Sequence, residues 1–172
     1  VITDASCNGA ADGTIEVTFA GGVGNYEISF DGGPWIPMTN PHVFSGLAAG
    51  DYSIQIRDGN GCTSPLTIYT INEPTAVTHS VVITDVTCND GSDGAIEVTA
   101  AGGTAPYEFS NDGGATWTTG ASNPHTFGTL TAGNYDIQVQ DANGCTSVIS
   151  TETVNEPAPI TFDTTLTNVT CN

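Results

Sequence analysis

Five cysteines are the residues of this chain whose type and spacing point most directly to chemistry. They stand at Cys7, Cys62, Cys88, Cys145 and Cys171. No Cys-x-x-Cys pair occurs, so the spacing gives little support to a zinc site or a thioredoxin-like redox site. Regularly spaced cysteines in an exported protein indicate a disulfide framework. All five are therefore candidates for disulfide bonds.

The cysteines can be paired in two ways. The simpler pairing closes one bond in each half of the chain, Cys7–Cys62 and Cys88–Cys145, and leaves Cys171 for a following unit. We expect this pairing. The alternative joins Cys7 to Cys145 across the two halves. It follows from distance: the loops that carry Cys7 and Cys62 would lie at opposite ends of a seven-stranded sandwich, whereas a disulfide needs Cα atoms within about 7 Å. In that alternative, Cys62, Cys88 and Cys171 pair with further units.

Carboxylates and amides gather in the loops and at the ends of the two halves, where they could bind calcium. The candidate ligands are Asp12, Asp58, Asn60 and Glu73, with their copies Asp93, Asp141, Asn143 and Glu156. Asp-x-Asn-Gly resembles part of a calcium loop, although the full EF-hand spacing with its terminal Glu is absent. For any single residue we expect the ordinary alternative, a side-chain hydrogen bond to the loop backbone. Taken together, they make a calcium-stiffened junction a hypothesis; no cofactor is required.

Other chemistry-bearing residues form no catalytic pattern. The chain has no Gly-x-Ser-x-Gly motif and no evident Ser/His/Asp or Cys/His arrangement, so we expect no enzyme. Trp35 and Trp117 each follow a Gly-Gly turn and could stack on a sugar ring. Most tryptophans instead cover part of a core. Asn168-Val-Thr170 has the form of an N-glycosylation site.

The charge of the chain excludes several classes of partner. The formal net charge is -18, from 19 acidic residues and one basic residue, Arg57. Nucleic-acid binding needs lysine and arginine to neutralise phosphates, and attraction to an anionic membrane needs the same residues. No apolar run approaches the roughly 20 residues of a membrane span. The sequence opens at Val1 without a signal peptide, so we expect a mature region or a segment of a longer protein.

The segments that position these residues occur twice. Leu47–Cys62 recurs as Leu130–Cys145, Ser6–Val17 as Thr87–Val98, and Asn72-Glu-Pro74 as Asn155-Glu-Pro157. Leu166–Asn172 then repeats Ile83–Asn89, as if a third copy were beginning. We expect one repeat at residues 1–74, a connector at 75–80, and a second repeat at 81–157. Residues 158–172 would be a connector and the first strand of a following repeat.

Each repeat has the pattern of a β-sandwich. Apolar and polar residues alternate with period two, as in Ile15, Val17 and Phe19, which is typical of half-buried strands. The first repeat contains seven such stretches, at about 1–6, 14–19, 26–31, 34–38, 42–46, 51–57 and 63–71. Tyr52 and Tyr135 are placed for a tyrosine corner. The pattern predicts an all-β chain of tandem Ig-like, seven-stranded antiparallel sandwiches arranged as a rod.

Several motifs together resemble one known repeat family. They are Thr-Cys-Asn followed by Asp-Gly-x-Ile-x-Val, then Ala-Gly-x-Tyr-x-Ile-x-Val-x-Asp-x-Asn-Gly-Cys, and finally Asn-Glu-Pro. The combination resembles the SprB-type repeat of very long cell-surface proteins of Bacteroidota, including gliding-motility adhesins. The resemblance implies export to the cell surface and a filament or adhesin role, and it brings no catalytic residues. Asp163-Thr164-Thr165 is similar to the sites that Bacteroidota O-glycosylate.

Two functional classes follow from these observations. The first is a structural repeat unit of an extracellular filament or adhesin stalk, whose partners are neighbouring copies of the same repeat, within one chain or between filament subunits. The alternative is a glycan- or surface-binding adhesive module that uses Trp35 and Trp117. The alternative requires both tryptophans to share an exposed face.

Overall fold

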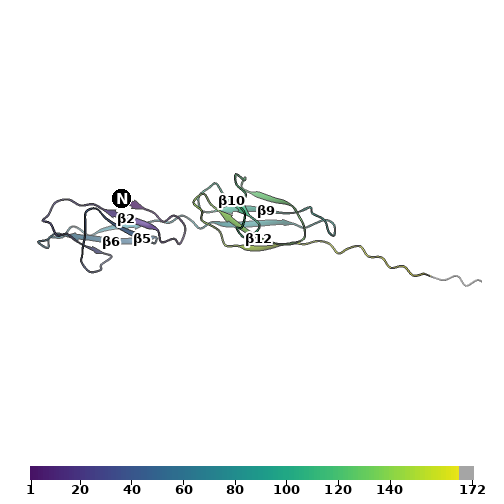
Figure 1. Cartoon of the computed structure of the whole chain (residues 1–172), viewed down its shortest axis with the longest axis horizontal. Helices are drawn as coiled ribbons and strands as arrows, with labels where there is room; N and C mark the ends of the chain where they lie inside the picture. The colour runs from purple at the N-terminus through teal and green to yellow at the C-terminus, as the bar shows by residue number, and fades with distance from the viewer. Residues whose placement is uncertain (167–172) are drawn as a thin grey trace, which may run out of the picture.

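The computed structural model describes residues 1–166, which form two β units lying end to end (Figure 1). We call the unit built from β1 to β7 the first unit and the unit built from β8 to β13 the second unit. All regular secondary structure in the described residues is β-strand. Within residues 1–166, no helix is long and apolar enough to cross a membrane. The all-β prediction is confirmed.

The first unit has two antiparallel sheets. β1 (Ile2–Thr3), β2 (Gly13–Val17) and β5 (His42–Leu47) form one sheet in the order β1-β2-β5. β3 (Glu27–Phe30), β4 (Ile36–Pro37), β6 (Gly50–Arg57) and β7 (Thr67–Ile71) form the other, in the order β4-β3-β6-β7. The strands fall on the seven stretches that the alternation predicts.

The second unit repeats this plan. β8 (Thr78–Thr84), β9 (Gly94–Ala101) and β11 (His125–Leu130) form a sheet in the order β11-β9-β8. β10 (Glu108–Ser110), β12 (Gly133–Gln140) and β13 (Ser150–Val154) form the other, in the order β10-β12-β13. In place of a second copy of β4, the described residues have only a bridge between Phe109 and Thr118. Strand β8 already begins at Thr78, within the stretch that the sequence assigned to a connector.

Each unit has its own core. Buried side chains of the first cluster centre on Ile15, Ile28 and Ile54, and the second cluster includes Ile96 and Phe109. On β9 the inward residues are buried while the residues between them are partly or fully exposed. The alternation of apolar and polar residues in the sequence therefore corresponds to the alternation of buried and exposed side chains along the strand. Burying one such large apolar side chain stabilises a fold by about 1.5–3 kcal/mol, so each unit is held chiefly by its own core.

Both predicted tyrosine corners are confirmed. The Tyr52 hydroxyl donates a hydrogen bond to the Ala48 carbonyl at 3.0 Å. The Tyr135 hydroxyl donates to the Thr131 carbonyl at 2.9 Å. In each unit the bond fixes the turn that leads into the long strand β6 or β12, so these tyrosines have a structural role.

The corner bonds can be tested by removing only the hydroxyl group. We expect Tyr52→Phe and Tyr135→Phe each to lower the free energy of unfolding by about 1 kcal/mol, the usual net contribution of one intramolecular hydrogen bond. Chemical denaturation followed by tryptophan fluorescence measures the change. Tyr69→Phe is the matched control, because Tyr69 lies on β7 outside the corner. Equal effects in all three variants would contradict the role assigned to the corners.

Candidate functional site: the junction between the units

A disulfide bond joins the two units. It links Cys7, in the loop between β1 and β2, to Cys145, in the loop between β12 and β13, with a Cα–Cα distance of 5.6 Å. Cys62 and Cys88 are free and exposed. The within-unit pairing expected from the sequence is therefore wrong, and the cross-junction alternative describes the structure. Cys171 lies outside the described residues.

Strand direction explains this pairing. Gly13, which follows the Cys7 loop, pairs with Leu47 just before β6 begins at Gly50. Strand β6 then runs from that end of the unit to Arg57, so Cys62 emerges at the opposite end. An eight-residue strand covers about 26 Å at 3.3 Å per residue, far beyond the reach of a disulfide. End-to-end stacking instead places the Cys7 end of one unit against the Cys145 end of the other.

The connector provides a second link across the junction. The Glu73 carboxylate accepts hydrogen bonds from the Asn8 side chain at 2.9 Å and from the Gly9 amide at 2.6 Å. Two residues further on, the Thr75 carbonyl accepts a hydrogen bond from the Gly103 amide at 2.9 Å. Val77 is buried in the core of the second unit. The connector is thus bonded to the first unit where it leaves and to the second unit where it arrives.

Gly102 permits the close approach of this connector. A Cβ atom at Gly102 would lie 2.0 Å from the Ala76 carbonyl oxygen, which only glycine avoids. The equivalent glycine of the first unit, Gly21, has no heavy atom within 4 Å of the same position. The connector therefore occupies a place on the second unit that is open on the first.

We call residues 4–12 and 85–93 the early loops. In the first, the Asn72 amide donates to Asp4 at 2.9 Å and the Ser6 amide donates to Asp12 at 2.9 Å. The second repeats both bonds. Its Asn155 amide donates to Asp85 at 2.8 Å, and its Thr87 amide donates to Asp93 at 3.0 Å. The two cysteines at these loops, Cys7 and Cys88, therefore stand on equivalent scaffolds.

We call residues 58–62 and 141–145 the late loops. In the first, Asp58 accepts hydrogen bonds from the Asn60 amide at 3.0 Å and the Cys62 amide at 2.9 Å. In the second, Asp141 accepts the same two bonds, from the Asn143 and Cys145 amides, both at 2.9 Å. Each aspartate thus folds the loop that presents a cysteine.

The loop hydrogen bonds hold several carboxylates in their charged form. Bonds from the Ser6 hydroxyl and amide lower the pKa of Asp12, and bonds from Thr87 do the same for Asp93. The Cys62 and Val23 amides lower the pKa of Asp58. At Asp112, the Ser110 and Thr116 hydroxyls lower the pKa to about 2. The cause in each case is donation to the ionised carboxylate.

These bonds also bear on the calcium hypothesis. Six of the eight candidate ligands are acidic, and the carboxylates of Asp12, Asp58, Glu73, Asp93, Asp141 and Glu156 all accept hydrogen bonds from nearby loop groups. Within residues 1–166, no group of three or more His, Cys, Asp or Glu side chains is placed to hold a metal ion. The ordinary alternative, side chains that fold their own loops, is what the structure describes. Calcium binding stays a prediction.

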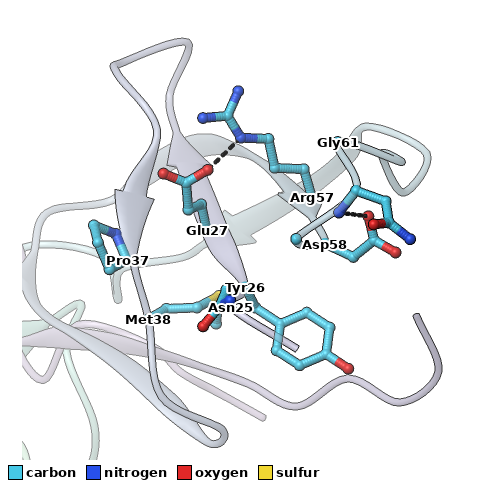
Figure 2. Close-up of a pocket in the computed structure, with 10 residues that line it drawn as sticks. Asn25, Tyr26, Glu27, Pro37, Met38, Arg57, Asp58 and Gly61 are labelled. Carbon is cyan, nitrogen blue, oxygen red and sulfur yellow. Dashed lines mark hydrogen bonds and ion pairs between the residues drawn. The ribbon is translucent and has the colours of Figure 1, made fainter. Parts of the chain in front are cut away.

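An open hollow of about 810 Å³ lies beside the first late loop (Figure 2). Arg57 forms an ion pair with Glu27 at its edge, and Asp58 turns towards the backbone of its own loop. The Arg57 guanidinium carbon also lies 4.7 Å from the centre of the Trp35 ring. Trp35 and Trp117 are both half-buried. A guanidinium therefore covers one face of the ring that the glycan alternative would need.

The histidines contribute to packing. His79, on β8, lies 2.9 Å from the Ser147 hydroxyl and 2.8 Å from the Ser150 hydroxyl. Burial lowers the pKa of His79. His42 and His125 make edge contacts with Phe44 and Phe127, with ring centres 4.8 and 4.7 Å apart. These contacts give the three histidines a structural role.

Two predicted glycosylation sites and two residues that the sequence analysis missed complete the site residues. Thr164 is exposed in a segment without secondary structure, and its glycosylation stays a prediction. Asn168 lies outside the described residues. Asp4 and Asp85, which bond the ends of the units, were missed by the sequence analysis. Their signal is an aspartate three residues before the first cysteine of each repeat.

Comparison with known protein families identifies the repeats. The family model for the SprB repeat matches residues 1–34 and 80–116. Each of these two segments thus matches the SprB repeat. They include the early loops with Cys7 and Cys88, so the early cysteines belong to the part of each SprB repeat that the family model recognises. No match was found among curated proteins.

Three solved structures resemble the chain at low sequence identity. Fibronectin(III)-like modules of Clostridium thermocellum CbhA are 16% identical, with 91% of this chain and 93% of that chain covered and a TM-score of 0.41. A C-terminal 282-residue intimin fragment, solved in complex with the intimin-binding domain of the translocated intimin receptor, is 15% identical. The match covers 91% of this chain and 64% of that chain, with a TM-score of 0.42. The amphioxus IgVJ-C2 molecule is 12% identical, with 82% and 94% covered and a TM-score of 0.34. Matches this weak say nothing about function.

The carboxylate of Asp112 gives a direct test of the loop hydrogen bonds. We expect it to titrate at about 2, below its ordinary value of 3.8. A lowered folded-state pKa contributes stability that is present above the unfolded value and is lost as the pH falls through the folded value. NMR titration of the carboxyl carbon measures the midpoint. Thr116→Val removes one donating hydroxyl and should raise the midpoint; an unchanged midpoint, or one near 3.8 in the unaltered chain, would contradict the assignment.

Proposed function

We propose that the chain is a load-bearing spacer, a structural repeat unit of an extracellular filament or adhesin stalk on a bacterial cell surface. The SprB repeats and the Ig-like fold support an extracellular adhesin-type repeat module. They equally support a structural module with no catalytic role. The bond between Cys7 and Cys145 is the observation that carries the more specific proposal.

That bond changes how tension passes through the chain. A pull applied to the two ends enters through β1 and leaves after β13. The disulfide offers a covalent path from Cys7 directly to Cys145, across a sequence separation of 138. Residues 8–144, which hold most of both cores, then lie outside the loaded path. The two units can stay folded under tension because the bridge carries the load past them.

The bond also restricts the angle between the units. A single flexible connector would allow one unit to swing about the other. Here the connector and the disulfide join the same two ends, and the connector is hydrogen-bonded on both sides. Two covalent links at one junction leave little freedom to bend, which is the property that a spacer requires. The net charge of -18 adds self-repulsion, which keeps the surface soluble.

The glycan-binding alternative lacks a comparable observation. It requires the two tryptophans to be presented together on an exposed face. Both are half-buried, and Arg57 lies over one of them. We therefore retain one proposed function.

Single-molecule stretching between the two ends of the chain tests the proposal. In the oxidised chain we expect no release of residues 8–144, because the disulfide bypasses them. After reduction, both units should unfold and release on the order of 450 Å of extended chain, at 3.3–3.6 Å per residue.

The double variant Cys7→Ser with Cys145→Ser is the matched control, since it should behave like the reduced chain without any reductant. Two full-length unfolding events in the oxidised, unaltered chain would contradict the proposed function. So would an identical trace before and after reduction.

A further inference from the structure

We propose that Cys62 and Cys88 are attachment sites for further repeats of the same kind. Cys88 would bond the late-loop cysteine of a repeat stacked beyond the second unit, and Cys62 the early-loop cysteine of a repeat stacked before the first. The partner at each end is thus another copy of this repeat. The inference deepens the proposed function and rests on it, because it extends the same lengthwise link to both ends of the chain.

The first argument is that the free cysteines have the same local geometry as the bonded pair. The Asp58 amide donates to the Cys62 carbonyl at 3.0 Å, and the Asp141 amide donates to the Cys145 carbonyl at 2.9 Å. With the two bonds that each aspartate accepts, both late loops have the same hydrogen bonds. The two early loops also share their hydrogen bonds. In each, a glutamate accepts a bond from a loop amide: Glu73 from the Gly9 amide at 2.6 Å, and Glu156 from the Asp90 amide at 2.7 Å.

The second argument is exposure. Cys145 and Asp141 are 9% and 4% exposed where the first unit lies against their loop. The equivalent Cys62 is exposed and Asp58 is only half-buried. Cys7 is half-buried at the junction, and its equivalent Cys88 is exposed. The same loops are therefore covered where a neighbouring unit is present and open at the two ends.

The third argument is the shape of the open ends. At the junction, Asn143 lines a hollow together with Asp4, Asn72 and Glu73 of the first unit. Its equivalent, Asn60, lines the open hollow beside Arg57 in Figure 2. Gly21 likewise leaves open the place that the Ala76 carbonyl occupies against Gly102. The surface of the first unit around Asn60 and Gly21 is thus open to a connector and an early loop of another copy. The second unit carries an early loop of that kind, with Cys88.

The bond itself forms by thiol–disulfide exchange. A small disulfide such as oxidised glutathione supplies the oxidising equivalents. The Cys88 thiolate attacks it, releasing one thiol and forming a mixed disulfide. The Cys62 thiolate of a second copy then attacks the Cys88 sulfur and displaces the other thiol. Two protein thiols lose two protons and two electrons, and the small disulfide is reduced to two thiols.

Continued in this way, the bridges would overlap. Cys88 precedes Cys145 in the sequence, so the bridge that starts at Cys88 begins before the bridge from Cys7 ends. Each repeat would then be bonded to the repeat before it and to the repeat after it. In an array of such repeats, every junction would be held by a disulfide bond as well as by its connector.

Two variants of the full chain test the inference, both in a Cys171→Ser background that removes the fifth cysteine. Both variants keep the Cys7–Cys145 bond; Cys62→Ser then leaves Cys88 as its one free thiol, and Cys88→Ser leaves Cys62. Each is incubated alone and in an equal mixture with oxidised and reduced glutathione, at about 0.15 M salt to screen the acidic surfaces. We expect a disulfide-linked dimer in the mixture and its loss in each variant alone.

The bond is located by cleavage before aspartate, which puts Cys62 on the peptide 58–84 and Cys88 on the peptide 85–89. A linked pair of these two peptides supports the inference. A mixture that gives no dimer, or a single variant that dimerises as readily as the mixture, overturns it. The proposed function is tested separately, since the stretching experiment depends on the Cys7–Cys145 bond and neither variant removes it.

Discussion

Attachment at two points is the constraint on which the rest of this structure depends. Each unit has a core of its own, so the cores alone do not hold the two units together. What joins them is a connector that is hydrogen-bonded on both sides and one disulfide between residues 138 apart in sequence. A bond that closes so long a loop also restricts the unfolded chain, by about 5 kcal/mol in the chain-entropy description. The two links together turn a pair of independent sandwiches into one elongated body (Figure 1).

The loops at the junction serve this attachment through their carboxylates. Aspartates at equivalent places in both units accept backbone hydrogen bonds and hold the cysteines in position, so an acidic, lysine-free chain uses its charge to shape loops. Ion pairing contributes little, because Arg57 is the one basic residue available. The same arrangement at both open ends is what makes the repeat suited to continuation. In the proposed function, the spacer gains length by adding copies, with each junction built from the same few loops.

Much of the fold could be predicted from the sequence because its signals are local. Period-two alternation located the strands of the first unit, and the Gly-x-Tyr spacing located Tyr52 and Tyr135. Disulfide pairing could not be predicted in the same way, since it depends on which end of a sandwich each loop occupies and on how two units stack. The close contact between Gly102 and the Ala76 carbonyl could not be predicted for the same reason, because Ala76 belongs to the connector between the units. In the second unit, a bridge between Phe109 and Thr118 replaces β4, and it follows a loop in which Asp112 accepts a hydrogen bond from the Thr116 amide. Residues 31–40 of the first unit correspond to residues 112–123 of the second, so the difference involves only two inserted residues.

The most direct test of the account is a disulfide map of the unaltered, oxidised chain. Cleavage before aspartate under non-reducing conditions places Cys7 on the peptide 4–11, Cys62 on 58–84 and Cys145 on 141–162. Mass spectrometry then identifies which peptides remain joined. The account predicts that 4–11 is joined to 141–162. A bond between 4–11 and 58–84 would place the disulfide inside the first unit and would contradict the central claim that the junction is covalently bridged.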